Sequence, residues 1–331
     1  MSTALYTHRR AVTVTVPATS ANLGPGFDCL GLALDLRNTL TLTASEFILF
    51  EEQETAYTVT INGVDAAKVP ADRTNLALEA AEVVFRLTGR RPAAAELRVH
   101  NCIPVGSGLG SSSSAIVGGL VAANALVNGG LSDQALLRLA VEMEGHPDNV
   151  APALLGGLVL GVLPDAESGP EQLVVRRMPP PRLMAVVVMP DFLFLTAEAR
   201  AVLPRQVSRA DAIFNTSRLG LLLHALLIND FSCLRVAMGD RLHQTQRLGI
   251  IPGAAAAYDA AYAAGALGVA LSGAGPSLIA FTDGDGDLIA TAMLDAFAAA
   301  GLSGRSWLLR PTADGASLTL INESAGTHSN G

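Results

Sequence analysis

Lysine is almost absent from this chain of 331 residues, in which Lys68 stands alone beside 21 arginines. That scarcity excludes two common nucleotide-binding designs. A P-loop needs a lysine after its last glycine to reach the β- and γ-phosphates, and a protein kinase needs a strand lysine that pairs with a helix glutamate. Lys68 lies in no glycine-rich context, so neither design fits.

Cysteine, positive charge and long apolar runs are also scarce. The three cysteines form no Cys-x-x-Cys pair, which predicts reduced thiols and argues against a zinc site. A net charge of −8 argues against binding to nucleic acid or to membrane surfaces. No stretch of about 18 apolar residues is free of glycine and proline, and residues 1–10 contain no apolar leader. We therefore expect a cytoplasmic protein without a membrane span.

The composition is that of a chain with a large core. Half of the residues are hydrophobic and 16% are charged, and the length suits two domains. Strand-like and helix-like segments mix in both halves, so we predict an α+β fold. The segment 168–181, with four prolines, predicts a linker. We place an N-terminal domain at 1–167, a C-terminal domain at 168–322 and a disordered polar tail at 323–331.

A glycine-rich segment is the most informative feature that is present. Three glycines occur within five positions of it, so its backbone can adopt positive φ and approach a ligand closely. An apolar run at 115–126 follows and predicts a helix. A turn that leads into a helix N-terminus directs several unpaired backbone N–H groups toward one point. This arrangement favours the binding of a phosphate group. We expect phosphate contacts from Pro104, Val105, Gly106, Ser107, Gly108, Leu109, Gly110, Ser111, Ser112, Ser113 and Ser114.

Two other interpretations of this segment fit less well. A dinucleotide-binding fold needs the spacing Gly-x-Gly-x-x-Gly and an acidic residue about 20 positions later, and the segment has neither. A flexible linker would not normally lie between the strand-like stretch 96–100 and an unbroken apolar helix.

The segment resembles the ATP-binding signature Pro-x-x-x-Gly-Leu-Gly-Ser-Ser of the GHMP kinases. Residues 16–34 look like the first motif of this family in the form carried by its homoserine kinase branch, and residues 271–277 look like its third motif. The resemblance implies a ribosomal S5 domain-2-like N-terminal half that binds ATP and a ferredoxin-like C-terminal half. It further implies Mg²⁺ as a cofactor and L-homoserine as the acceptor, in threonine biosynthesis.

Two glutamates at the end of a predicted helix are candidates for the metal. The helix spans 132–144, with Ser132 as its N-cap, and ends with Glu142 and Glu144. The helix dipole disfavours acidic residues at this end, which indicates a functional reason for at least one. By the resemblance, Glu144 is the metal ligand and a catalytic residue, Glu142 is the reserve, and Ser114 adds a hydroxyl.

A dense polar segment follows this helix. It resembles the His-x-Asp-Asn segment of the homoserine kinase branch, which implies that Asn149 is catalytic and that His146 and Asp148 bind substrate. Other members of the family use an aspartate with a lysine as general base. Because this chain has no suitable lysine, positioning and electrostatics fit better than a base.

An amino-acid acceptor presents one carboxylate and one ammonium group. Arginine suits the carboxylate because its planar fork offers several donors, and carboxylate or amide oxygens suit the ammonium group. The resemblance implies Arg200 and Arg247 as these arginines, and Arg200, four residues after Thr196 on one helix face, is also assigned to catalysis. The complete predicted acceptor set is Asn22, Asp28, His146, Asp148, Thr196, Arg200, Arg247 and Gly273.

Three questions stay open at this stage. The chain could be a mevalonate-type kinase of the same superfamily, which would have no use for both Asp28 and the two arginines. It could also be a non-catalytic nucleotide-binding module, against which the retained Glu144 and Asn149 argue. A homodimer is neither required nor excluded.

Overall fold

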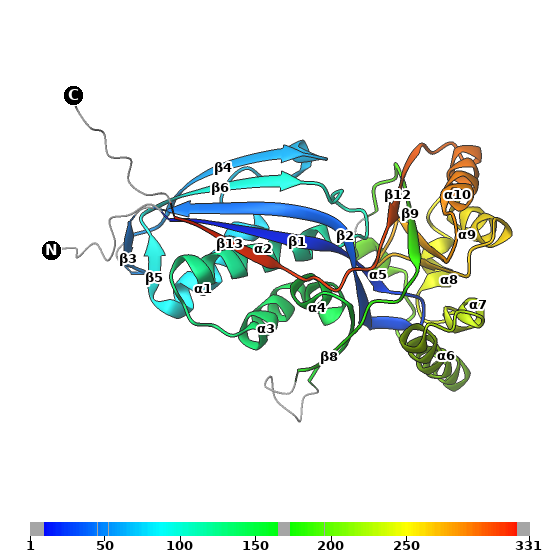
Figure 1. Cartoon of the computed structure of the whole chain (residues 1–331). Helices are drawn as coiled ribbons and strands as arrows, with labels where there is room; N and C mark the ends of the chain where they lie inside the picture. Colours follow the sequence, from blue (N-terminus) through cyan, green and yellow to red (C-terminus); the bar gives the residue numbers. More distant parts are fainter. Residues whose placement is uncertain (1–9, 45, 52, 165–172, 195, 323–331) are drawn as a thin grey trace.

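The computed structural model describes residues 10–44, 46–51, 53–164, 173–194 and 196–322, so the predicted tail at 323–331 lies outside the described residues. The chain forms two halves side by side, one built on a long sheet and a smaller one built on a short sheet (Figure 1). Helices cover both sheets, and the prediction of an α+β fold is confirmed.

The larger half is built on a seven-stranded sheet. Its strands are β1 (Arg10–Asn22), β2 (Gly26–Ala44), β4 (Ala56–Gly63), β6 (Ala94–Asn101), β7 (Leu158–Val162), β8 (Val174–Met178) and β13 (Ser317–Asn322). The main order is β13-β1-β2-β6-β4, with β7 paired to β2 and β8 paired to β7. Alternation sets the inner face, because Leu40 and Leu42 are buried while the hydroxyls of Thr13 and Thr41 bond each other at 2.9 Å.

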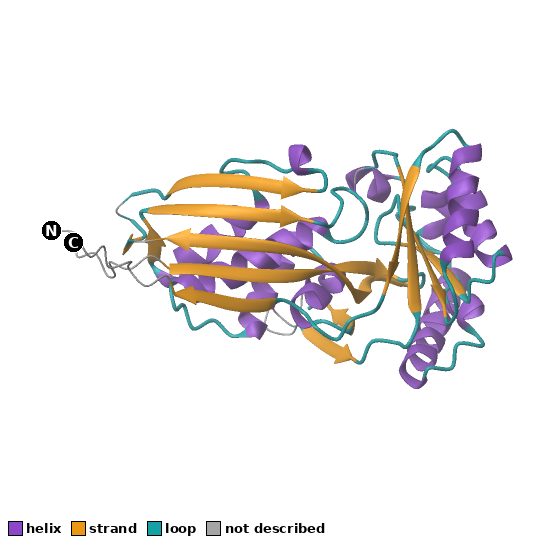
Figure 2. Cartoon of the chain, turned by 45° about the horizontal axis from the view of Figure 1, so that its top comes forward, coloured by secondary structure: helices purple, strands orange, loops and turns teal. Residues whose placement is uncertain are grey.

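Helices pack on one face of this sheet (Figure 2). They are α1 (Leu76–Thr88), α2 (Ser111–Leu126), α3 (Asp133–Glu144) and α4 (Pro147–Leu155), accompanied by the short helix η1 (Ala66–Lys68) and the strand pair β3 (Phe47–Leu49) and β5 (Arg90–Pro92). Ser132 caps α3 as predicted, since its side chain accepts from the backbone of Ala135. Helix α2 begins at Ser111, four residues earlier than predicted, because the serines form its first turn.

The β1–β2 hairpin joins the two halves. A bulge follows Pro17, which has no backbone N–H for the ladder, and the register of the two strands shifts there. Beyond the bulge, Leu30 and Leu32 of β2 belong to a buried cluster that also contains Val187 and Ile279 of the smaller half. The first sequence motif is therefore held between the two halves.

The smaller half is a four-stranded antiparallel sheet with helices packed against it (Figure 2). Its strand order is β10 (Gly268–Leu271), β11 (Leu278–Thr282), β9 (Met184–Pro190) and β12 (Gly304–Leu309). Its helices are α5 (Thr196–Ala201), α6 (Arg209–Ile228), α7 (Leu234–Ala237), α8 (Gln244–Leu248), α9 (Ala254–Ala263) and α10 (Asp287–Ala299). By length and composition α6 could cross a membrane, a test that a core helix of a soluble protein also passes.

The structure differs from the sequence prediction in two further places. The sequence pattern over 233–242 predicts one helix. In the structure α7 ends at Ala237, and the Asp240 carboxylate accepts the backbone N–H groups of 242–244 and starts a separate helix. The expected linker over 168–181 contains β8, and β13 also returns to the large sheet. A single cut after residue 167 therefore does not separate the two halves.

Candidate functional site

A cavity of about 300 Å³ lies where the three sequence motifs meet. The glycine loop contributes Val105, Gly106, Ser107, Gly108, Gly110, Ser111 and Ser112 to its walls. The predicted metal, catalytic and acceptor residues that line it are Asn22, Asp28, Glu144, His146, Asp148, Asn149, Arg200, Arg247 and Gly273. Residues more than 200 positions apart in the chain are thus gathered around one space.

The glycines of the loop serve two different purposes. All three adopt positive φ, between +67° and +80°. A Cβ atom on Gly108 would lie 2.2 Å from the carbonyl oxygen of Ser272, so this glycine allows the loop to touch the third motif. A Cβ atom on Gly106 would meet no protein atom within 4 Å, although Gly106 lines the cavity. Gly106 therefore leaves its space to a ligand.

The remaining loop residues hold its shape. The Ser107 hydroxyl donates to the Pro104 carbonyl at 2.8 Å, and the Leu109 carbonyl accepts from the backbone of Thr19 at 3.1 Å. Pro104 and Leu109 are not on the cavity wall, so the structure places them behind the predicted phosphate contacts.

Glu144 is the acidic residue that meets the loop. Its Oε1 atom accepts from the hydroxyls of Ser112 and Ser113, at 3.0 and 2.9 Å. Glu142 is exposed and does not line the cavity. A carboxylate with neighbouring hydroxyls is the oxygen donor set that Mg²⁺ prefers, so these residues fit a magnesium site.

Ser114 departs from the prediction that it ligates the metal. Its side chain is buried, its hydroxyl donates to the Ser111 carbonyl at 2.8 Å, and it accepts from Asn38 at 2.9 Å. Both interactions turn the hydroxyl away from the cavity, whose walls do not include Ser114. The hydroxyls of Ser112, which lines the cavity, and of Ser113, which is buried, both donate to Glu144 instead.

The polar segment after α3 supplies a hydrogen-bonded histidine–aspartate pair and an amide. Nδ1 of His146 is bonded to the carboxylate of Asp148, which is 2% exposed. Burial alone would lower the pKa of His146, but the hydrogen bond and charge of Asp148, with Glu144 and Asp28, raise it above its ordinary value. Asn149 accepts from the Thr19 hydroxyl at 2.7 Å, which ties it to β1.

Asp28 and Arg200 form a two-pronged ion pair, at 2.9 and 3.0 Å. Asp28 adopts positive φ, and its backbone N–H donates to the amide oxygen of Asn22 at 2.9 Å. The amide nitrogen of Asn22 donates to the Gly273 carbonyl at 2.8 Å. Asn22 therefore joins the first motif to the third, and its side chain is already engaged.

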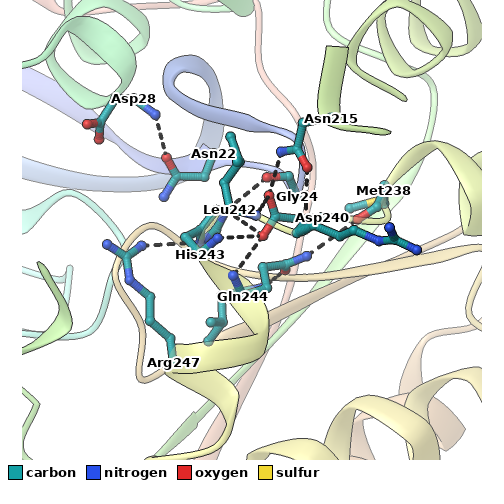
Figure 3. A network of polar contacts seen from close by, with 12 residues as sticks. Asn22, Gly24, Asp28, Asn215, Met238, Asp240, Leu242, His243, Gln244 and Arg247 are labelled. Atoms are coloured by element: carbon teal, nitrogen blue, oxygen red, sulfur yellow. Dashed lines mark hydrogen bonds and ion pairs between the residues drawn. The ribbon is translucent and has the colours of Figure 1, made fainter. Parts of the chain in front are cut away.

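Arg247 is the buried cation of the site (Figure 3). Its Nε donates to the Ala199 carbonyl at 3.0 Å, and Nη1 lies 3.3 Å from Nδ1 of His243. Its guanidinium also lies 5.2 Å from the centre of the Phe27 ring. Burial first, then the charge of Arg200, lowers the pKa of Arg247 to about 10, so it stays protonated at neutral pH.

Several residues on the walls were not predicted. Lys68 lines the cavity and lies 3.3 Å from Asp65, whose carboxylate accepts from the backbone of Val105 at 3.2 Å. The isolation of this single lysine was a signal in the sequence, but nothing near it indicated a site. Further unpredicted wall residues are Val69, Pro70, Asn75, Leu76, Ala115, Phe194, Ala274 and Gly275. Thr196 begins α5, and its side chain lies outside the described part of the chain.

Known proteins resemble both halves of the chain. Residues 75–157 match the family model of the GHMP kinases N terminal domain, and residues 222–299 match that of the GHMP kinases C terminal. The homoserine kinase of Desulfitobacterium hafniense is 42% identical, over 93% of this chain and 99% of that protein. That of Moorella thermoacetica is 45% identical, over 87% and 93%. The crystal structure of homoserine kinase from Cytophaga hutchinsonii has a TM-score of 0.80 and 31% identity, over 93% and 97%.

Proposed function

Because this chain belongs to the homoserine kinases of the GHMP kinase family, we propose that it transfers the γ-phosphoryl group of ATP to the side-chain hydroxyl of L-homoserine. The product would be O-phospho-L-homoserine, an intermediate of threonine biosynthesis. One observation carries this proposal: a single cavity is lined both by a phosphate-binding glycine loop and by charges of both signs that suit an amino acid.

The glycine loop is the proposed site of the triphosphate. Its positive-φ glycines and the start of α2 present backbone N–H groups, and helix N-termini of this kind attract anions. Lys68 lies beside the start of the loop and is a further cation on the wall. The less polar wall residues Val69, Pro70 and Leu76 are suited to the flat base of a nucleotide.

Glu144, with the hydroxyls of Ser112 and Ser113, would hold Mg²⁺. When bound, the ion would neutralise charge on the phosphate oxygens that otherwise repel an incoming oxygen atom. Glu144 must then be ionised, and the two serine hydroxyls keep its carboxylate directed toward the loop.

The charges at the acceptor residues match a zwitterion. Arg247 and Arg200 would bind the carboxylate of homoserine, and Asp28 with Asp148 would bind its ammonium group. Ligand atoms of Asp28, His146 and Asp148 lie within 4.8 Å of one another, which concentrates negative charge at one spot. The Asp28–Arg200 pair would open to admit the substrate, each side chain exchanging its present partner for a substrate charge.

Transfer would depend on positioning rather than on a general base. Each carboxylate among the described wall residues already accepts a hydrogen bond: Asp28 from Arg200, Asp148 from His146, and Glu144 from two serines. The Asn149 side chain, tied to Thr19, would orient the acceptor hydroxyl toward the γ-phosphorus. In-line placement and charge stabilisation carry most of such a reaction.

A coupled assay of ADP release with candidate acceptors tests the function. We expect turnover with L-homoserine, with the product identified by mass spectrometry as phosphohomoserine. Mevalonate should give no turnover, because it has no ammonium group for Asp28 and Asp148. ATP binding without turnover on any acceptor would instead indicate a non-catalytic nucleotide-binding module.

The remaining proposals concern cellular context. We place the enzyme in the cytoplasm, where its substrates and reduced thiols are found. The net charge of −8 gives no support to nucleic-acid or membrane partners. A homodimer is compatible with the fold, and sedimentation of the purified protein would determine it.

A further inference from the structure

Asp240 is the most completely hydrogen-bonded carboxylate near the site, yet it does not line the cavity (Figure 3). Its side chain is 0% exposed. Oδ1 accepts from Nδ2 of Asn215 at 2.6 Å and from the backbone of Leu242 at 3.1 Å. Oδ2 accepts from the backbones of His243 and Gln244, at 2.8 and 2.7 Å. A buried carboxylate is stable only with such hydrogen-bond partners, and both oxygens of Asp240 are fully engaged by them.

Those contacts place His243 at the start of α8. The His243 side chain is 0% exposed, and its Nε2 lies 2.9 Å from the Gly24 carbonyl. A carbonyl oxygen can only accept, so Nε2 carries the hydrogen atom. Phe27 stacks on the ring, with centroids 4.9 Å apart. The first sequence motif therefore contacts both an edge and a face of the ring.

The tautomer of His243 leaves Nδ1 as an acceptor that faces Arg247. In the neutral ring only one nitrogen carries hydrogen, and Nη1 of Arg247 lies 3.3 Å from Nδ1. Burial lowers the pKa of His243, which favours this neutral form although Asp240 opposes the shift. Protonation would place a second positive charge against the guanidinium.

Arg247 is consequently held by three groups. Nε donates to the Ala199 carbonyl, and Nη1 is shared between His243 and the Gly273 carbonyl at 3.4 Å. Among the described residues, Nη2 has no hydrogen-bond partner, so it remains available to an anion in the cavity. Ala199 directly precedes Arg200, so the same contact relates the two arginines to each other.

We propose that Asp240 is a positioning residue that acts through His243 to aim Arg247 at the carboxylate of the acceptor. This inference rests on the proposed function, because it assumes that Arg247 binds that carboxylate. It adds a specificity determinant outside the cavity, because Asp240 would contact neither ATP nor homoserine and yet set the affinity for homoserine.

Asp240→Asn tests this role, because it keeps the shape but turns an NH₂ group toward backbone donors in either orientation. We expect the KM for homoserine to rise roughly tenfold or more, with the KM for ATP within about twofold of wild type. Gln244→Leu is the matched control, since Gln244 lies on the helix of Arg247 and keeps its backbone bond to Asp240, while its side chain bonds Leu271 and Met238. It should lower the melting temperature with little change in the KM for homoserine.

A double-mutant cycle separates positioning from general support. In an Arg247→Lys background, Asp240→Asn should raise the KM for homoserine little further, because its route through Arg247 is already lost. Three results would overturn the proposal. They are effects of the two substitutions on the KM for homoserine that multiply, an equal rise in the KM for ATP, or the same rise in the Gln244→Leu control. If Asp240→Asn does not fold, His243→Phe tests the same connection through His243 to Arg247, since it keeps the backbone contacts of Asp240.

Nitrogen-15 NMR of labelled histidine gives a readout that needs no substrate. The wild type should show His243 neutral with hydrogen on Nε2. Asp240→Asn should lose this single tautomer, because the displaced backbone of His243 would no longer hold Nε2 at the Gly24 carbonyl. An unchanged tautomer in the variant would contradict the positioning role. If the wild type does not phosphorylate homoserine, the proposed function fails, while the NMR comparison still decides whether Asp240 controls His243.

Discussion

The carboxylate of Asp28 and the guanidinium of Arg200 bind each other across 172 positions of sequence, through two parallel hydrogen bonds. One residue belongs to the first motif and the other to α5 of the smaller half. Each was predicted to bind an opposite charge of the substrate. Because they satisfy each other in this structure, binding of a zwitterion at these residues would exchange one set of charge pairs for another.

Replacing Arg200 should weaken homoserine and spare ATP. The Arg200 side chain is 42% exposed, so solvent screens its interactions and we expect Arg200→Ala to raise the KM for homoserine by roughly tenfold. Arg247→Ala should cost more, because Arg247 is buried. Steady-state kinetics would measure both. The control is Arg205→Ala, an exposed arginine outside the cavity. Equal turnover by wild type of homoserine and 3-aminopropan-1-ol, which lacks the carboxylate, would contradict the arginine clamp.

Gly106 and Gly108 should respond differently to the same change. Gly106→Ala adds a methyl group where no protein atom lies within 4 Å, so it should weaken ATP by roughly tenfold while costing only about 1–2 kcal/mol of backbone strain. Gly108→Ala drives its methyl into the Ser272 carbonyl and should lower the melting temperature clearly more. Gly301→Ala, at φ +81° with nothing within 4 Å, is the control for strain alone. Calorimetry that shows undiminished ATP affinity in Gly106→Ala would remove the loop from the phosphate site.

Glu144 and Glu142 provide a matched pair for the metal. Glu144→Gln should lower kcat on the order of 100-fold and raise the Mg²⁺ concentration needed for half-maximal rate, because the carboxylate near Ser112 and Ser113 is lost. Glu142→Gln should leave both within about twofold. Titration of Mg²⁺ at saturating ATP and homoserine would measure this. The reverse order would assign the ligand to Glu142.

Cys29 should be chemically inert in the folded protein. Burial first, then the charges of Asp148 and Asp28, raises the pKa of its thiol to about 11. The neutral thiol is therefore favoured, which contributes stability at ordinary pH and is lost as the pH rises through 11. At pH 8 iodoacetamide should label Cys29 roughly 100-fold more slowly than an ordinary thiol. Labelling in urea should restore the ordinary rate, and fast labelling of the native protein would refute the shift.

Local patterns in the sequence predicted much of the fold, and the family resemblance indicated most of the candidate site residues that line the cavity. The N-cap of α3 at Ser132 and the glycine loop are short-range features, readable because they depend on a few neighbouring residues. The departures at 233–242 and at β8 have a tertiary cause. The expected helix is interrupted where the Asp240 carboxylate accepts the backbone N–H groups of 242–244, and β8 lies in an expected linker because β7 supplies its partner.

What the sequence by itself determined is the set of candidate residues for the chemistry: the glycine loop, Glu144, the His146–Asn149 segment and the charged residues of the acceptor set. What only the tertiary structure decided is how they meet. It turned Ser114 into the core and brought Lys68 to the cavity wall. It also paired Asp28 with Arg200 and placed Asp240 behind Arg247 through His243. Such contacts join residues far apart in the chain. Helix and strand periodicity describes only residues close in sequence, so it does not indicate contacts that arise when the two sheets pack together.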